Sequence, residues 1–119
     1  MNYKFEIGTL TSTEYVSLIT AVGWKIGGNV NLDAVERALA VTPYIVVVRN
    51  SSGEAIAAGR AFSDDLTMTF IPDILVKPEH QRSGLGREIM EMIKSRYGHT
   101  LFYFGGQKEE FFEKLGFQK

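Results

Sequence analysis

The chain has 119 residues, a formal net charge of −1 and no cysteine. This length suits a single domain over residues 1–119, and 45% hydrophobic residues allow that domain a core of its own. The lack of cysteine excludes a disulfide framework, a cysteine nucleophile and a thiolate metal site. The charge gives no reason to expect nucleic acid or a membrane as a partner. No signal-peptide pattern and no apolar run of about eighteen residues are present, so we expect a cytoplasmic protein.

Two apolar stripes with helical spacing predict two helices in the first half of the chain. The first spans residues 11–22, with Ser12 or Thr13 as its N-cap. The second spans residues 32–39, with Asn31 as its cap. A strand of alternating apolar and polar residues is predicted before them, over residues 3–7.

The middle of the chain predicts strands joined by turns. Residues 44–48 are a continuous β-branched run, which is typical of a buried strand. After a turn, residues 54–62 form its hairpin partner, and their small side chains indicate close packing. A long strand follows over residues 66–76. Because Pro72 within it lacks an N–H group, an edge or a bulge is expected there.

The last third predicts a helix over residues 85–97, a strand over 101–104 and a short helix over 109–115. The order of elements predicts an α/β fold with a mixed, mostly antiparallel sheet that is flanked by helices. The hairpins supply the antiparallel pairs, and the strand–helix–strand unit at the end supplies a parallel crossover.

The segment Gln81-Arg82-Ser83-Gly84-Leu85-Gly86 lies between a predicted strand and a predicted helix. Its glycines let the backbone approach a ligand, and a helix N-terminus attracts anions, here beside Arg82 and Arg87. A pyrophosphate would fit. The segment is not a Walker A loop, since Arg87 follows Gly86, and it is not a dinucleotide fingerprint, since Ile89 replaces the third glycine. A glycine-rich turn that binds nothing is the alternative.

Two segments resemble the GNAT acetyltransferase superfamily. Residues 76–86 resemble its acetyl-CoA signature, Gln/Arg-x-x-Gly-x-Gly/Ala, and residues 111–117, Phe-Phe-Glu-Lys-Leu-Gly-Phe, are similar to a second segment typical of it. The resemblance implies a splayed central strand pair, acetyl-CoA as co-substrate, and direct acetyl transfer to a primary amine on a small molecule or a protein lysine. A catalytically silent acyl-CoA-binding or interaction module is the alternative.

The resemblance also implies where acetyl-CoA would lie. The pantetheine arm would follow the strand that ends at Val76, the pyrophosphate would sit on the loop, and the thioester would point toward Pro72 and Asp73. The implied cofactor-binding residues are Ile74, Leu75, Val76, Gln81, Arg82, Ser83, Gly84, Leu85, Gly86, Arg87 and Phe112.

The same resemblance suggests catalytic and acceptor residues. Asp73 is the candidate for the base or the amine anchor, and a positioning or solvated aspartate at a bulge is its alternative. Phe112 occupies the place of the tyrosine that usually protonates the thiolate, so Tyr103, solvent or an absence of turnover are the options. For Tyr103 itself, an aromatic residue of the strand packed in the core is the favoured interpretation. Trp24 could stack on the acceptor or cover the core.

No metal site is expected, because the spacing of His80 and His99 suits surface histidines. Superfamily members usually continue beyond the Gly116-Phe117 pair with one or two strands, whereas this sequence stops at Lys119. Those strands are dispensed with, supplied by a partner, or missing from a shortened sequence. An unpaired strand edge leads us to expect a homodimer.

Overall fold

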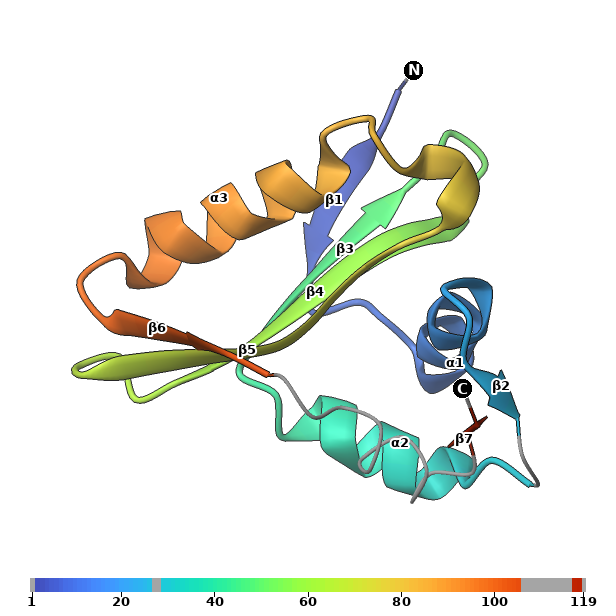
Figure 1. Ribbon diagram of the computed structural model, residues 1–119, viewed down its shortest axis with the longest axis horizontal. Coiled ribbons are helices and arrows are strands. Elements are labelled where there is room, and N and C mark those ends of the chain that lie inside the picture. Colours follow the sequence, from blue (N-terminus) through green and yellow to red (C-terminus); the bar gives the residue numbers. More distant parts are fainter. Residues whose placement is uncertain (1, 27–28, 106–116, 119) are drawn as a thin grey trace.

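The computed structural model describes residues 2–26, 29–105 and 117–118. Its main sheet has the strand order β1-β3-β4-β5-β6, in which β5 and β6 are parallel and the other neighbours are antiparallel (Figure 1). The strands are β1 (Lys4–Ile7), β3 (Tyr44–Arg49), β4 (Ala55–Ser63), β5 (Met68–Val76) and β6 (Leu101–Phe104). The predicted mixed, mostly antiparallel sheet is therefore confirmed.

In the described part of the chain, three helices flank this sheet: α1 (Ser12–Ala21), α2 (Leu32–Ala40) and α3 (Leu85–Tyr97), with a short 3-10 turn, η1 (Pro78–His80), before α3. A small second sheet pairs β2 (Lys25–Ile26) with β7 (Phe117–Gln118). These two strands were not predicted, because a two-residue strand carries no readable alternation. No helix in the described ranges is long and apolar enough to cross a membrane.

The helices cover opposite faces of the sheet, and β3 shows why. Ile45 and Val47 belong to the core under α1 and α2, whereas Val46 and Val48 belong to the core under α3. Successive strand residues point to opposite faces, so a strand between two helical layers is apolar at every position. The continuous run predicted as a buried strand is confirmed for this reason, and Figure 1 shows α3 on one side of the sheet and α2 on the other.

The small residues of β4 let α3 approach closely, as predicted. A Cβ atom at Gly59 would collide with the side chain of Ile89, which is fully buried on α3. Every residue from Ala55 to Ala61 is buried. The α3 layer therefore packs directly on the strand beside β5, and this contact fixes the position of the α3 N-terminus.

The caps correct one expectation and confirm another. The N-cap of α1 is Thr11, one residue before the predicted position, because Glu14 completes a capping box with it. The Glu14 N–H donates to the Thr11 hydroxyl (3.1 Å), and the Thr11 N–H donates to the Glu14 carboxylate (3.0 Å). Asn31 caps α2 as predicted, accepting from the Ala34 N–H at 3.1 Å.

The long strand predicted over residues 66–76 begins at Met68. The Asp64 carboxylate accepts the backbone N–H groups of Leu66, Thr67 and Met68 at 2.7–3.0 Å, and these bonds hold the preceding residues in a turn. The predicted short helix over residues 109–115 lies outside the described residues, as does Phe112.

Candidate active site

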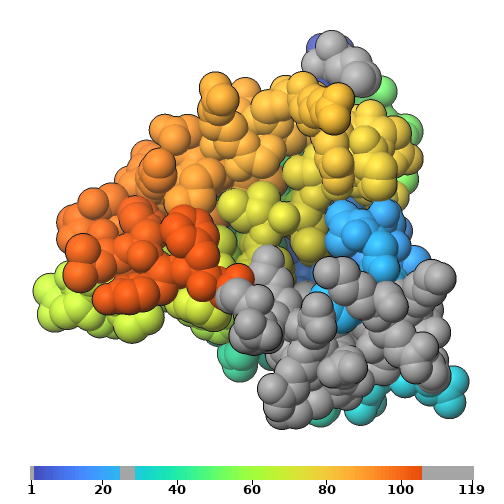
Figure 2. Space-filling view, viewed as in Figure 1, coloured from blue at the N-terminus to red at the C-terminus, as the bar shows by residue number. Residues whose placement is uncertain are grey.

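The parallel pair β5–β6 separates halfway along β5. Register pairing runs from Met68 with Leu101 to Ile71 with Phe104, and the Gly105 N–H then donates to the Ile71 carbonyl at 3.0 Å. From Pro72 to Val76, β5 has no partner on this side among the described residues. The splayed strand pair expected from the sequence is therefore present, and Figure 2 shows atoms of β5, coloured yellow-green to yellow, at the surface beside orange α3 and β6.

The unpaired half of β5 presents backbone polar groups toward this split. The Lys77 N–H donates to the Ile56 carbonyl at 3.0 Å, so Lys77 directs its backbone groups toward β4. Because these directions alternate along a strand, Ile74 and Val76 direct theirs away from β4. Leu75 directs its backbone groups toward β4, and its side chain is buried under α1 and α2.

A close contact marks the point of separation. The register of β4 against β5 shifts between Arg60 and Phe62, opposite Pro72, which agrees with the predicted bulge. A Cβ atom at Gly105 would lie 3.2 Å from both the Cα and the carbonyl oxygen of Pro72. Gly105 thus lets β6 leave β5 at this point. Our sequence analysis missed Gly105, although a glycine directly after a strand was an available signal.

The loop before α3 is shaped for an anion. Gly84 is the N-cap of α3 with φ of 85° and supplies no side-chain cap, and Arg82 also has a left-handed backbone with φ of 65°. The first intrahelical bond runs from the Glu88 N–H to the Gly84 carbonyl at 3.0 Å. The N–H groups of the first helical turn, Leu85 to Arg87, consequently have no acceptor within the helix.

The loop and the first turn of α3 line a cavity of about 480 Å³ at the end of β5. Its lining contains most of the residues predicted to bind the cofactor: Val76, Gln81, Arg82, Gly84, Leu85, Gly86 and Arg87. His80 lines the cavity as well. Arg82 and Arg87 are both exposed at this site and add positive charge to that of the helix N-terminus.

Hydrogen bonds hold the loop in this shape. The Gln81 amide donates to the Val76 carbonyl at 3.0 Å, and the Ser83 hydroxyl donates to the His80 carbonyl. The His80 ring is half-buried, with its Nδ1 3.1 Å from the Tyr3 hydroxyl. His80 is thus partly buried, because Tyr3 packs edge-on against its ring. His99 is exposed, as predicted, and bonds to Asp65.

Asp73 lies beside the split, but its side chain points to the opposite face from the loop. Its carboxylate is 2% exposed and accepts the Tyr15 hydroxyl at 2.7 Å. Arg60 donates to the same oxygen from Nε at 3.1 Å and from Nη2 at 2.9 Å. Arg60 also lies over the Tyr15 ring, with its Cζ 5.1 Å from the centroid. We call Tyr15, Arg60 and Asp73 the buried triad.

The electrostatics of the buried triad keep its hydrogen-bonding roles fixed. Burial raises the pKa of Tyr15, and the neighbouring Asp73 carboxylate raises it further, so the phenol stays a donor. Burial is the largest single influence on the pKa of Arg60 and lowers it, but the charges of Asp73 and Tyr15 and the hydrogen bonds to them together outweigh burial, so the pKa is raised overall. The triad therefore ties α1, β4 and β5 together at the split.

Sequence reasoning singled out Asp73 but missed both of its partners. Tyr15 precedes Asp73 by 58 positions and was interpreted only as one residue of an apolar helix face. Arg60 lies 13 positions before Asp73. A lone arginine within the small apolar residues of β4 was the available signal, because a buried charge needs a partner.

The two aromatic candidates differ in their surroundings. Tyr103 is opposite Phe70 in the β5–β6 register and its side chain is 51% exposed, so the expectation of a core aromatic is not met. It lies at the split, next to Phe104, which pairs with Ile71. Trp24 is half-buried and packs against the core under α1 and α2, in agreement with a covering role.

Comparisons with known proteins agree with this geometry. Residues 28–119 match the family model of the acetyltransferase (GNAT) domain. A GNAT family acetyltransferase of Streptococcus pneumoniae superposes with a TM-score of 0.73 at 20% identity, covering 98% of this chain and 88% of that one. A probable acetyltransferase of Staphylococcus aureus gives 0.74 at 22% identity, covering 99% and 91%. Glucosamine-6-phosphate N-acetyltransferase of Arabidopsis thaliana gives 0.60 at 17% identity, covering 98% and 92%.

A sequence search among curated proteins finds no match. These three solved structures are each under 25% identical to this chain, so they support the fold alone. The family model matches the sequence itself over most of the chain. With the split strand pair, the glycine-containing loop before α3 and the matched family model in agreement, this chain belongs to the GNAT acetyltransferase family.

Proposed function

We propose that the protein transfers an acetyl group from acetyl-CoA directly to a primary amine. The observation that carries this proposal is that the split strand pair lies beside the N-terminus of α3. The outward backbone groups of Ile74 and Val76 suit the amides of a pantetheine arm, and the first-turn N–H groups of α3 suit a pyrophosphate. One extended molecule that carries both groups would fit the two surfaces together.

Gly86 gives a test of this fit within the structure. A Cβ atom at Gly86 would face the side chains of Val76 and Ile74, at 3.9 Å and 4.0 Å. These are ordinary van der Waals distances, so a methyl group would fit, whereas a branched side chain would extend further toward Ile74 and Val76. A small residue at this position therefore suits a ligand that passes between strand and helix.

The chemistry requires little from the protein beyond positioning. Bound acetyl-CoA supplies an activated thioester, at whose carbonyl carbon the neutral amine forms a C–N bond while the C–S bond breaks. The nitrogen loses a proton to water, and the leaving thiolate takes one, its conjugate acid having a pKa of about 8.5. We propose the exposed hydroxyl of Tyr103 as the donor of that proton.

We assign Asp73 a positioning role in this reaction. Its buried carboxylate accepts bonds from Tyr15 and Arg60 on the face of the sheet opposite the loop, so it is directed at these partners and not at the coenzyme. It holds α1 against the bulge of β5, next to the place where the thioester would lie. An effect of Asp73 on turnover would then arise through the geometry of the split rather than through proton transfer.

The test is thiol release from acetyl-CoA in the presence of a panel of primary amines, with mass spectrometry of the acetylated product. We expect release that depends on both the amine and the protein, and its loss in Gly86→Val. If acetyl-CoA binds to the wild type but no amine accelerates thiol release, the protein is an acyl-CoA-binding module and the proposal is wrong.

A further inference from the structure

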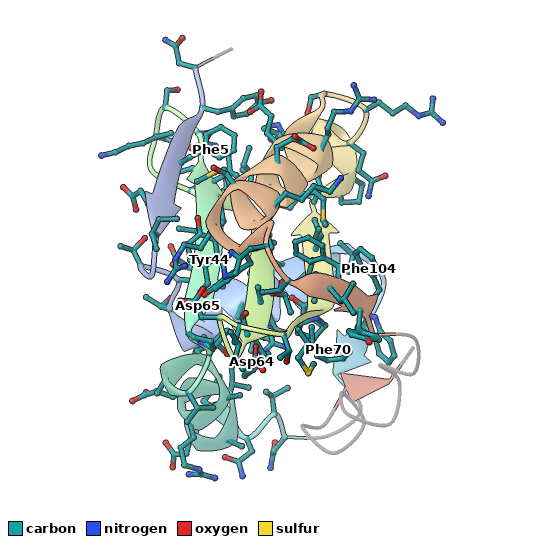
Figure 3. The ribbon with its side chains drawn as sticks, turned by 90° about the vertical axis from the view of Figure 1, so that its left-hand side faces the viewer. Phe5, Tyr44, Asp64, Asp65, Phe70 and Phe104 are labelled. Atoms are coloured by element: carbon teal, nitrogen blue, oxygen red, sulfur yellow. The ribbon has the colours of Figure 1, made fainter. Side chains whose placement is uncertain are left out.

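A second cavity, which shares no residue with the loop cavity, lies at the β6 end of the sheet. Its volume is about 620 Å³, and it is open to solvent, since Leu101, Tyr103 and Phe104 are all exposed. It is lined by Thr67, Met68, Phe70, Leu101, Tyr103 and Phe104, and we call it the aromatic hollow. Figure 3 shows labelled Phe70 and Phe104 at this end of the molecule, near β6.

The aromatic hollow lies along the paired half of β5 and β6 and ends beside the split. Ile71 is part of the core under α3, and Thr69 is buried against Thr100. Because strand residues alternate, Met68 and Phe70 point to the opposite face. Phe104, at the other end of the hollow, pairs with Ile71, the last residue before the strands separate. The hollow therefore ends next to the point where the split begins.

None of the described residues that line the aromatic hollow carries a charge. Their polar side-chain groups are the hydroxyls of Thr67 and Tyr103. The nearby carboxylates have other partners: Asp64 accepts three backbone N–H groups of the turn, and Asp65 pairs with Arg96 and His99. Asp73 is bound by Arg60. Among the described residues, no carboxylate near the hollow is left to bind a second ammonium group.

We infer that the acceptor is an amine with a single amino group on an apolar, aromatic body, an arylalkylamine by chemical class. The ring would lie among Met68, Phe70 and Leu101, and the amino group would extend past Tyr103 to the split. Polyamines and amino sugars would lose their hydration there without gaining an ion pair. This inference rests on the proposed function, since it names the acceptor of that same reaction.

The proposed acceptor class is tested without turnover by measuring how amines bind to the protein saturated with CoA, which carries no acyl group. By calorimetry, 2-phenylethylamine should bind at least about tenfold more tightly than spermidine or glucosamine, the factor expected for burying one phenyl ring. Leu101→Glu, at a position that is 67% exposed, should reverse the preference between phenylethylamine and spermidine. The matched control is Val41→Glu, which is 71% exposed at the end of α2 and should change nothing.

Two results would overturn the inference. One is equal or tighter binding of spermidine or glucosamine by the wild type. The other is a dimer in light scattering that Leu101→Glu, but not Val41→Glu, converts to a monomer, because the hollow would then be covered by a second copy of the chain. Failure of the proposed function is a separate observation: phenylethylamine would bind as described, yet no amine would release thiol from acetyl-CoA.

Discussion

The loop before α3 and the buried triad flank the same stretch of β5, but they are built in opposite ways. The loop is a continuous segment, and the groups that we propose to bind the pyrophosphate are backbone N–H groups at the start of α3. The triad is formed by side chains of α1, β4 and β5 that are 58 and 13 positions apart from Asp73 in the sequence. The first region should therefore govern ligand affinity, and the second should govern the stability of the split.

The largest effect is expected from Arg60→Met. It leaves the Asp73 carboxylate buried at 2% exposure without its cation, so the free energy of unfolding should fall by about 3–5 kcal/mol. Urea denaturation measures this. The double variant Arg60→Met with Asp73→Leu should recover most of the loss, because no unpaired charge remains. A double variant no more stable than Arg60→Met would show that the pair itself is not the cause.

Tyr15→Phe should have a smaller effect on the same region. The substitution removes the hydroxyl that donates to Asp73 at 2.7 Å but keeps the ring under Arg60. A hydrogen bond to a charged group contributes about 1.5–3 kcal/mol, and the unfolding free energy should fall by that amount. Acetyl-CoA affinity should stay within about twofold, because the triad is not part of the loop. If the binding free energy of acetyl-CoA fell by more than the free energy of unfolding, the triad would govern ligand affinity, which would contradict the proposed separation of roles.

Gly86→Val should show the reverse pattern. The added side chain fills the space toward Val76 and Ile74, so acetyl-CoA affinity should fall at least about tenfold, which is about 1.4 kcal/mol, while the protein stays folded. Gly86→Ala is the matched control: its Cβ has ordinary van der Waals room, and it should keep binding and gain a few tenths of a kcal/mol of helix stability. Calorimetry and melting curves separate the two effects.

The smallest effect concerns acid stability at the far edge of the sheet. Hydrogen bonds from Thr9 and Arg49 lower the pKa of Glu6 from 4.5 to about 2. A carboxylate with a lowered folded-state pKa stabilises the fold above about pH 4.5 and loses that contribution as the pH falls toward 2. The unfolding free energy should therefore decline over this window, and Glu6→Gln should make the decline shallower. If the unfolding free energy of Glu6→Gln declined with falling pH as steeply as that of the wild type, Glu6 would not be a cause of the decline.

The contrast between the two regions also explains what the sequence could predict. The loop, the α3 helix, β6 and the buried strand β3 are local patterns, and all were predicted close to their observed limits. The triad could not be predicted, because Arg60 and Tyr15 meet Asp73 only after the sheet and α1 have packed. The aromatic hollow was missed for the same reason, since Phe70 and Tyr103 become neighbours only through the β5–β6 register.

The central claim, that the split and the loop together bind an acyl-CoA, is tested most directly by titration calorimetry of acetyl-CoA with the wild type and with Gly86→Val. We predict one site per chain in the wild type, an affinity that falls as salt rises because phosphates meet Arg82 and Arg87, and at least about tenfold weaker binding by the variant. Absence of binding by the wild type, or equal affinity in the two proteins, would contradict the account.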